Sequence, residues 1–136
     1  MSNYNIIIDK YGTKRYYLNN KLHREDGPAV EYNNGYKAWY KNGERHRKDG
    51  PAVEYTNGTK VWYKNGKLHR EDGPAIKGLN GHQEWWLNGE RHRKDGPAME
   101  CADDYKYWYL NDKLYGKNND FNNQSWSKFI KTLIFS

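Results

Sequence analysis

Hydrophobic and polar positions along this chain recur every 23 residues, five times over. The five repeats are residues 6–28, 29–51, 52–74, 75–97 and 98–120. Self-similarity at a period of about 20 to 50 residues is typical of proteins that stack one small structural unit. A residue that recurs in every repeat is therefore expected first to hold the stack together.

Within one repeat, the pattern predicts three short strands. In the second repeat, residues 29–32 alternate, and residues 36–41 form an aromatic, β-prone run. An Asn-Gly pair then precedes residues 44–47, and this pair favours the type I′ turn of a hairpin. An Asp-Gly-Pro motif ends the third strand, because proline has no N–H for a ladder. The predicted fold class is therefore all-β, an elongated antiparallel sheet of hairpin or meander repeats.

Two aromatic positions and one aliphatic position recur as columns through the repeats. The aromatic columns are Tyr16, Trp39, Trp62, Trp85 and Trp108, and Tyr17, Tyr40, Tyr63, Trp86 and Tyr109. The aliphatic column is Ile7, Val30, Val53, Ile76 and Met99. Since adjacent strand residues point to opposite faces, each face of the sheet carries an aromatic row. We interpret the columns as the core, with an exposed aromatic binding platform as the alternative.

After residue 120 the pattern changes to a helical period. Apolar residues fall at i, i+3, i+4, i+7 and i+8, namely Trp126, Phe129, Ile130, Leu133 and Ile134. This spacing predicts an amphipathic helix in the tail, residues 121–136. The helix is expected to cap the end of the sheet, which otherwise invites pairing with another strand. The alternative is a docking or dimerisation helix, so these five residues are a candidate interaction surface.

The low hydrophobic and high charged content of the chain is similar to that of disordered proteins, but its aromatic content is not. Hydrophobic residues make up 35% and charged residues 29% of the 136 residues, with a mean hydropathy of −1.30. Aromatic residues reach 16%, whereas disordered chains are poor in them, so we expect a thin, aromatic-rich fold. There is one cysteine, and neither a secretory leader nor a membrane span is evident. A cytoplasmic protein is expected.

The net charge of +6 permits binding to nucleic acid or to an anionic lipid surface. One column of like charge recurs in the first four repeats: Arg24, Arg47, Arg70 and Arg93. The simpler interpretation is that the arginines lie on a solvated face, where the aspartates balance their positive charge. The functional one is a basic stripe that binds planar anions, with the aromatic residues stacking on bases.

Histidine and aspartate form a second polar pattern, three residues apart in each of the first four repeats. The residues are His23 and Asp26, His46 and Asp49, His69 and Asp72, and His92 and Asp95. Equivalent residues of successive hairpins lie roughly 10 Å apart, too far to share a metal ion. We therefore predict no metal and no cofactor, and a structural corner in which His and Asp bond each other or the loop. No catalytic constellation is evident, so the chain is predicted not to be an enzyme.

The run WYKNGERH at residues 39–46, followed by Gly50 and by VEYTNG at residues 53–58, resembles the MORN repeat. The run WYKNGKLH at residues 62–69 matches that motif closely, and the resemblance covers residues 6–120. The sequence departs from the family in its His-Arg-Glu/Lys-Asp-Gly-Pro-Ala segment, where the usual motif has His-Gly-x-Gly. It therefore looks like a MORN variant of the kind found in repeat proteins of large DNA viruses, which would place it in the host cytoplasm.

The resemblance implies successive hairpins in one sheet, and a role in scaffolding, protein binding or oligomerisation. The leading hypothesis is therefore a non-enzymatic repeat scaffold that mediates protein–protein interaction, with a homodimer as one form of it. The alternative is an anion-binding module that uses the arginine column to bind nucleic acid or phosphoinositide.

Overall fold

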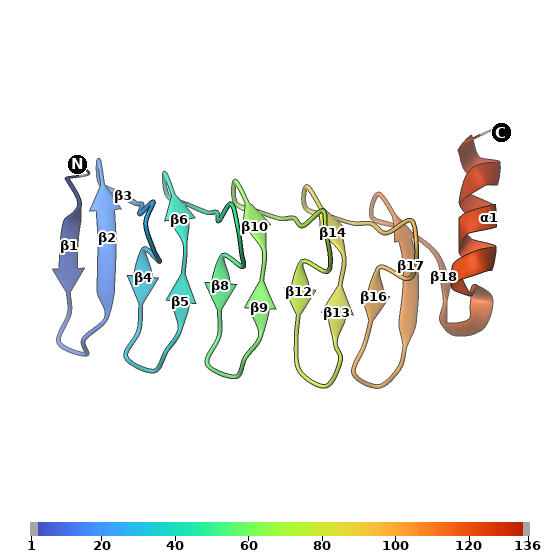
Figure 1. Ribbon diagram of the computed structural model, residues 1–136, viewed down its shortest axis with the longest axis horizontal. Coiled ribbons are helices and arrows are strands. Elements are labelled where there is room, and N and C mark those ends of the chain that lie inside the picture. The colour runs from blue at the N-terminus through green and yellow to red at the C-terminus, as the bar shows by residue number, and fades with distance from the viewer. Residues whose placement is uncertain (1–2, 135–136) are drawn as a thin grey trace. The chain divides into compact units, whose positions relative to one another are not determined.

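The computed structural model describes residues 3–134. The chain forms two compact units, Met1–Leu68 and His69–Ser136, and each is described by itself. Both consist of short antiparallel strands in a meander, and the second unit also carries the C-terminal helix (Figure 1). The predicted all-β class with a capping helix is confirmed. The boundary between the units falls inside the predicted third repeat, residues 52–74.

The described part of the first unit contains eleven strands: β1 (Asn5–Ile8), β2 (Lys14–Leu18), β3 (Lys21–Leu22), β4 (Val30–Glu31), β5 (Lys37–Ala38), β6 (Tyr40–Lys41), β7 (Glu44–Arg45), β8 (Val53–Glu54), β9 (Lys60–Val61), β10 (Tyr63–Lys64) and β11 (Lys67–Leu68). Its sheet has the order β1-β2-β4-β5-β8-β9, and β3 pairs with β2. The pairs β6–β7 and β10–β11 are separate two-stranded hairpins. In the register, Ala38 lies opposite Val30 on one side and Val53 on the other.

In the second unit, the residues up to 134 form seven strands: β12 (Ile76–Lys77), β13 (Gln83–Glu84), β14 (Trp86–Leu87), β15 (Glu90–Arg91), β16 (Met99–Glu100), β17 (Lys106–Leu110) and β18 (Lys113–Lys117). Its sheet has the order β12-β13-β16-β17-β18, and β14 pairs with β15. A 3-10 turn, η1 (Asn118–Asp120), leads to the helix α1 (Asn123–Ile134). The predicted tail, residues 121–136, therefore contains the helix, and its residues 135–136 lie outside the described part.

The aromatic run at residues 36–41 was predicted as one strand, but it is divided between β5 and β6. At Trp39 the backbone changes partner: its N–H donates to the Ala52 carbonyl at 2.7 Å, and its carbonyl accepts from the His46 N–H at 3.0 Å. The first half of the run, β5, therefore pairs with β4 of its own repeat and with β8 of the next repeat, and the second half, β6, forms a hairpin with β7 of its own repeat. The third strand is correspondingly short, Glu44–Arg45 rather than residues 44–47.

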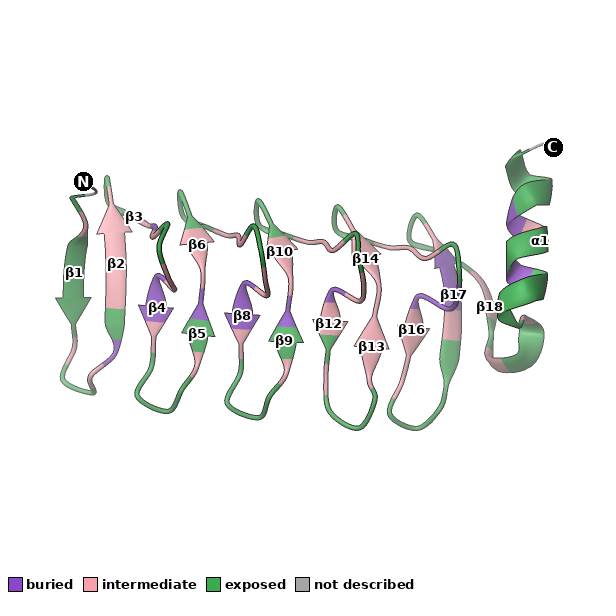
Figure 2. Ribbon diagram, in the orientation of Figure 1, coloured by how far each residue is buried: buried purple, intermediate pink, exposed green. Residues whose placement is uncertain are grey.

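The innermost position is the alanine that follows each proline. Ala29, Ala52, Ala75 and Ala98 are all 0% exposed. The aromatic columns are mostly half-buried, and Val30 and Val53 of the aliphatic column are buried, whereas Ile7 is exposed (Figure 2). Within each unit the columns therefore contribute to the core as predicted, together with buried alanine side chains that the sequence analysis did not single out.

The helix α1 packs its apolar face on the last repeat of the second unit. Trp126 and Ile130 are buried with Trp108, and Phe121 and Phe129 pack around them. The rings of Trp108 and Trp126 lie 5.5 Å apart, and the Trp126 Nε1–H donates to the Arg93 carbonyl at 3.0 Å. The helix thus buries aromatic surface that strands alone would leave open to water.

Candidate functional site

Each corner histidine bonds to the hairpin of the next repeat. The Nδ1 atom of His23 accepts a hydrogen bond from the backbone N–H of Asn42 at 3.0 Å. The same bond joins His46 to Asn65, His69 to Asn88 and His92 to Asn111, at 3.0, 2.9 and 3.0 Å. Because Nδ1 accepts, these rings are neutral and carry their proton on Nε2. In the described residues the histidines thus contact the next repeat, and the predicted bond between His and Asp is wrong.

The hairpin tip that receives the histidine has the geometry that its Asn-Gly pair predicts. Asn42 and Gly43 have φ values of 51° and 81°, as a type I′ turn requires. The Gly43 N–H also donates to the carbonyl of Leu22 at 2.8 Å. The equivalent bonds of Gly66 to the Arg45 carbonyl and of Asp112 to the Arg91 carbonyl are both 2.9 Å, so these three tips are each fixed to the preceding repeat at two neighbouring backbone atoms.

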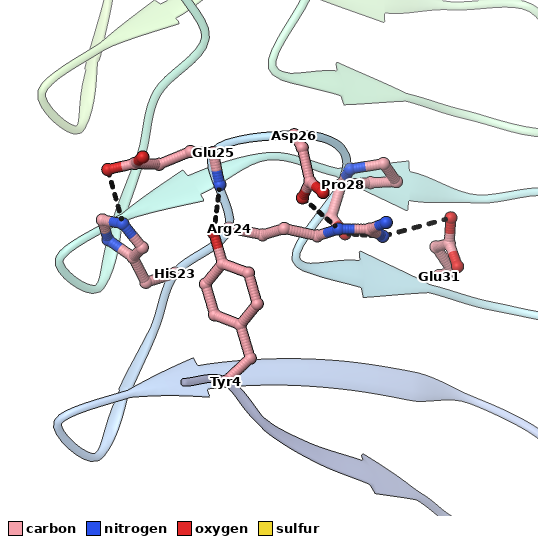
Figure 3. Close-up of polar contacts among 7 residues, drawn as sticks. All are labelled: Tyr4, His23, Arg24, Glu25, Asp26, Pro28 and Glu31. Atoms are coloured by element: carbon pink, nitrogen blue, oxygen red, sulfur yellow. Dashed lines mark hydrogen bonds and ion pairs between the residues drawn. The ribbon is translucent and has the colours of Figure 1, made fainter. Parts of the chain in front are cut away.

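The corner arginine stacks on the first aromatic column. The guanidinium carbon of Arg24 lies 4.0 Å from the ring centre of Tyr16, and that of Arg47 lies 3.9 Å from the ring centre of Trp39. Arg24 also donates from Nε to Asp26 at 3.0 Å and from Nη1 to the carbonyl of Pro28 at 3.1 Å (Figure 3). One arginine therefore joins the aromatic column, the aspartate and the Asp-Gly-Pro loop.

The four arginine side chains are mostly covered. Arg24, Arg47, Arg70 and Arg93 are 20%, 27%, 21% and 18% exposed. Each donates from Nη1 to the carbonyl of the corner proline, and each pairs with the corner aspartate. The arginines are thus paired with the aspartates, as the simpler interpretation expects, but their side chains are less solvated than that interpretation assumed. The basic anion-binding stripe stays a prediction.

The fifth repeat replaces this arrangement. Gly116 stands at the arginine position and Tyr115 at the histidine position. A Cβ atom on Gly116 would lie 2.8 Å from a ring carbon of Phe121, so the arginine position has no room for a side chain. The Trp108 ring is covered by Phe121 and Trp126 instead, with ring centres 5.7 and 5.5 Å away. An aromatic cluster therefore takes the place of the stacked guanidinium at the end of the array.

The predicted interaction residues of the helix have different exposures. Trp126 and Ile130 are buried, and Phe129 is half-buried against Tyr115 and Phe121. Leu133 and Ile134 are exposed. The first part of the apolar face packs on the sheet and caps it, whereas the last turn of the helix is exposed.

A row of tyrosines in the first unit is the aromatic surface that the sequence analysis missed. Tyr32, Tyr36 and Tyr55, here called the tyrosine row, have successive ring centres 4.8 and 5.5 Å apart. Tyr32 and Tyr55 are each 42% exposed, and burial raises the pKa of Tyr36. The available signal was the recurrence of tyrosine at equivalent positions 32 and 55 of the second and third repeats.

In the second unit, the side chains at the equivalent repeat positions are of a different kind. The His82 Nε2 atom lies 2.8 Å from Glu84, whose other oxygen accepts from the Trp86 Nε1–H at 3.1 Å. Burial, followed by the nearby carboxylates, raises the pKa of the half-buried Cys101 thiol. Residues 3–134 contain no group of three or more His, Cys, Asp or Glu side chains arranged to hold a metal ion.

No protein-family model matches the chain, and comparison with curated proteins finds no match. The resemblance to MORN repeats therefore stays a prediction. Among the described residues, no helix has the length and apolar character needed to cross a membrane.

Proposed function

We propose that the protein is a non-enzymatic repeat scaffold that binds a protein partner through the tyrosine row. The observation that carries this proposal is the partial exposure of Tyr32 and Tyr55, each of which has its ring in contact with the ring of Tyr36. Tyrosine is enriched in protein interfaces and among the residues that contribute most to affinity. Rings already fixed by their neighbours lose little further freedom when a partner binds.

The repeated corners support the non-enzymatic part of the proposal. Their histidines, arginines and aspartates are the residue types from which catalytic and metal sites are built. In this chain, His Nδ1 accepts from the next hairpin, and the arginine and aspartate bond each other. These groups are occupied by the same structural contacts in each of the first four repeats.

The proposal is tested by replacing the two exposed tyrosines together, Tyr32→Ser with Tyr55→Ser. The matched control is Tyr11→Ser, because Tyr11 is 70% exposed and lies outside the row. Affinity capture from the native cell, quantified by mass spectrometry, should recover a partner with the wild type and the control. The double variant should recover roughly tenfold less, as the loss of an interface hot spot implies. Equal recovery of the partner by all three proteins would contradict the proposal.

The alternative of an anion-binding module has less support. The corner arginines that would bind nucleic acid or phosphoinositide already bond aspartate and proline carbonyl groups. That alternative requires binding that weakens steeply with salt and is removed by Arg47→Ala with Arg70→Ala. Titration of the protein with single-stranded DNA and with phosphoinositide-containing vesicles at two salt concentrations separates it from the scaffold.

A further inference from the structure

Among the described residues, strand β1 forms an open edge of the sheet in the first unit. It pairs with β2 on one side, and it is the outermost strand of that sheet (Figure 1). Ile6, Ile7 and Ile8 are 50%, 48% and 60% exposed. Natural edge strands usually carry lysine, proline or a bulge that prevents pairing with another chain, and β1 carries none of these. The edge is thus both apolar and unprotected.

The register shows which backbone groups of β1 face outward. The N–H of Tyr16 donates to the Ala29 carbonyl at 2.8 Å, and its carbonyl accepts from the His23 N–H at 3.0 Å. Both groups of Tyr16 therefore point away from Ile6, which lies opposite it. In an antiparallel ladder such a pair is not hydrogen-bonded, and the pattern alternates along the strand. The N–H and carbonyl groups of Ile6 and Ile8 therefore point into the open edge.

We propose that β1 binds β1 of a second molecule of this chain, antiparallel, with the two-fold axis at Ile7. The outward groups are symmetric about Ile7, because Ile6 and Ile8 flank it at equal distance. In this register Ile6 of one molecule and Ile8 of the other exchange both backbone hydrogen bonds, and the reciprocal pair does the same. The two Ile7 side chains then face each other as the close, non-hydrogen-bonded pair.

The charges near the edge are compatible with this partner despite the net charge of +6. The paired segment, Asn5–Ile8, is uncharged. The register places Asp9 across from Asn5 of the second molecule and Lys10 across from its Tyr4, so no like charges face each other directly. Asp9 is itself paired with Arg15 at 3.1 Å within its own molecule.

The size of the contact sets the expected strength. Four backbone hydrogen bonds and six half-exposed isoleucines form a contact below the roughly 1,200 Å² of stable interfaces. The dimer is therefore weak and concentration-dependent, and raising the salt concentration strengthens it by screening the repulsion between the two positive molecules. This inference goes beyond the proposed function, because it names a second surface, β1, and a second molecule of this chain as the partner of that surface.

Analytical ultracentrifugation of the full chain, from micromolar to millimolar concentration, tests the proposal. The wild type should shift from monomer to dimer as concentration rises, and Ile7→Lys should remain monomeric, because it places two like charges directly opposite each other. The control is Ile134→Lys, since Ile134 is also a solvent-exposed isoleucine, at 67%. A wild type that is monomeric at every concentration would overturn the proposal, as would dimerisation of Ile7→Lys with wild-type affinity.

Disulfide crosslinking tests the register. In a Cys101→Ser background, Ile7→Cys should form a crosslinked dimer under mild oxidation, because paired Cα atoms about 4.5 Å apart lie within disulfide range. Ile6→Cys should crosslink at least tenfold more slowly, since Ile6 faces Ile8 of the second molecule. Faster crosslinking through Ile6→Cys would refute the register. The Tyr32→Ser, Tyr55→Ser protein should still dimerise, so failure of the dimer and failure of the tyrosine row are distinguishable.

Discussion

At the scale of single residues, the corner histidine depends on its protonation state. Its Nδ1 atom accepts a hydrogen bond, and a protonated ring has no acceptor to offer. The pKa values of His46 and His92 are lowered, first by burial and then by nearby lysines: Lys41 and Lys64 for His46, and Lys94 for His92. Burial and the hydrogen bond therefore both favour the neutral ring.

The lowered pKa values predict a loss of stability in mild acid. The unfolded chain has the ordinary histidine pKa of 6.5, so it binds protons more readily than the folded chain below that value. Stability is full above pH 6.5 and falls as the pH drops through 6.5 toward the lower folded pKa. Urea unfolding at about pH 7.5 and about pH 5.5 should show a lower midpoint in acid. A variant with His46→Gln and His92→Gln should show a smaller difference, and an unchanged wild-type midpoint would contradict this account.

The stacked arginine predicts that lysine is a poor substitute. Arg93 lies 3.7 Å from the ring centre of Trp85 and donates to Asp95 and to the Pro97 carbonyl. Lysine cannot stack its ammonium group while donating in this planar pattern, so Arg93→Lys should lower the free energy of unfolding by about 1–2 kcal/mol. The exposed Lys94→Arg is the control, and equal stability of the two variants would show that the stacking contributes nothing.

At the scale of the element, α1 completes the last repeat. It supplies Trp126 to the Trp108 ring, which has no stacked arginine because Gly116 occupies that position. The side chain of Ser125 accepts from the Asn122 N–H at 2.9 Å, and the Asn122 side chain accepts from the Ser125 N–H at 2.8 Å. This reciprocal cap fixes the start of the helix where Trp126 must enter the cluster.

Truncation of the central aromatic residue measures the contribution of the cap. Trp126 is fully buried, so Trp126→Ala should lower the free energy of unfolding by about 3–5 kcal/mol through lost burial and a residual cavity. The neighbouring Ser127→Ala is the control, because Ser127 is exposed. Thermal unfolding monitored by circular dichroism compares the two variants. A loss under about 1 kcal/mol for Trp126→Ala would mean that the helix does not cap the repeat.

The secondary-structure elements also show which features of the fold can be predicted from the sequence. Repeat period, hairpin turns and the helix follow from local patterns, since Asn-Gly pairs and the i, i+4 spacing encode their own geometry. The division of residues 36–41 at Trp39 does not, because the exchange of partners depends on Ala52 in the next repeat. The partner of His23 was missed for the same reason, since Asn42 lies 19 residues away. Local sequence patterns identified the corner residues but did not predict the contacts that these residues make between repeats.

At the scale of the whole molecule, bonds between repeats join residues that are close in sequence. Beyond the histidine bonds, Gly43 bonds Leu22 and Gly66 bonds Arg45 in the first unit, and Asp112 bonds Arg91 in the second. A protein in which each repeat contacts mainly its neighbours has a stability that is close to a sum of local terms. The loss of stability that a mutation causes should therefore decrease with distance from the mutated repeat.

Hydrogen exchange tests this local behaviour. In Trp126→Ala, amide protection should fall in β17 and β18 and stay near the wild-type level in β4 and β5, because local openings in repeat proteins need not involve distant repeats. Mass spectrometry of peptides from the intact protein resolves the two regions. A uniform loss of protection across the chain would indicate a single cooperative unit instead.

Gly116 has a consequence for how such a chain lengthens. The second, third and fourth repeats each carry both a tip that bonds the preceding histidine and a histidine that bonds the following tip, so a duplicated 23-residue segment inserted among them would meet compatible neighbours on both sides. The fifth repeat has the tip but lacks the histidine and the arginine, so a copy of this repeat would not offer those two contacts to a following tip. The residues at positions 115 and 116 thus restrict compatible duplication to the repeats before them.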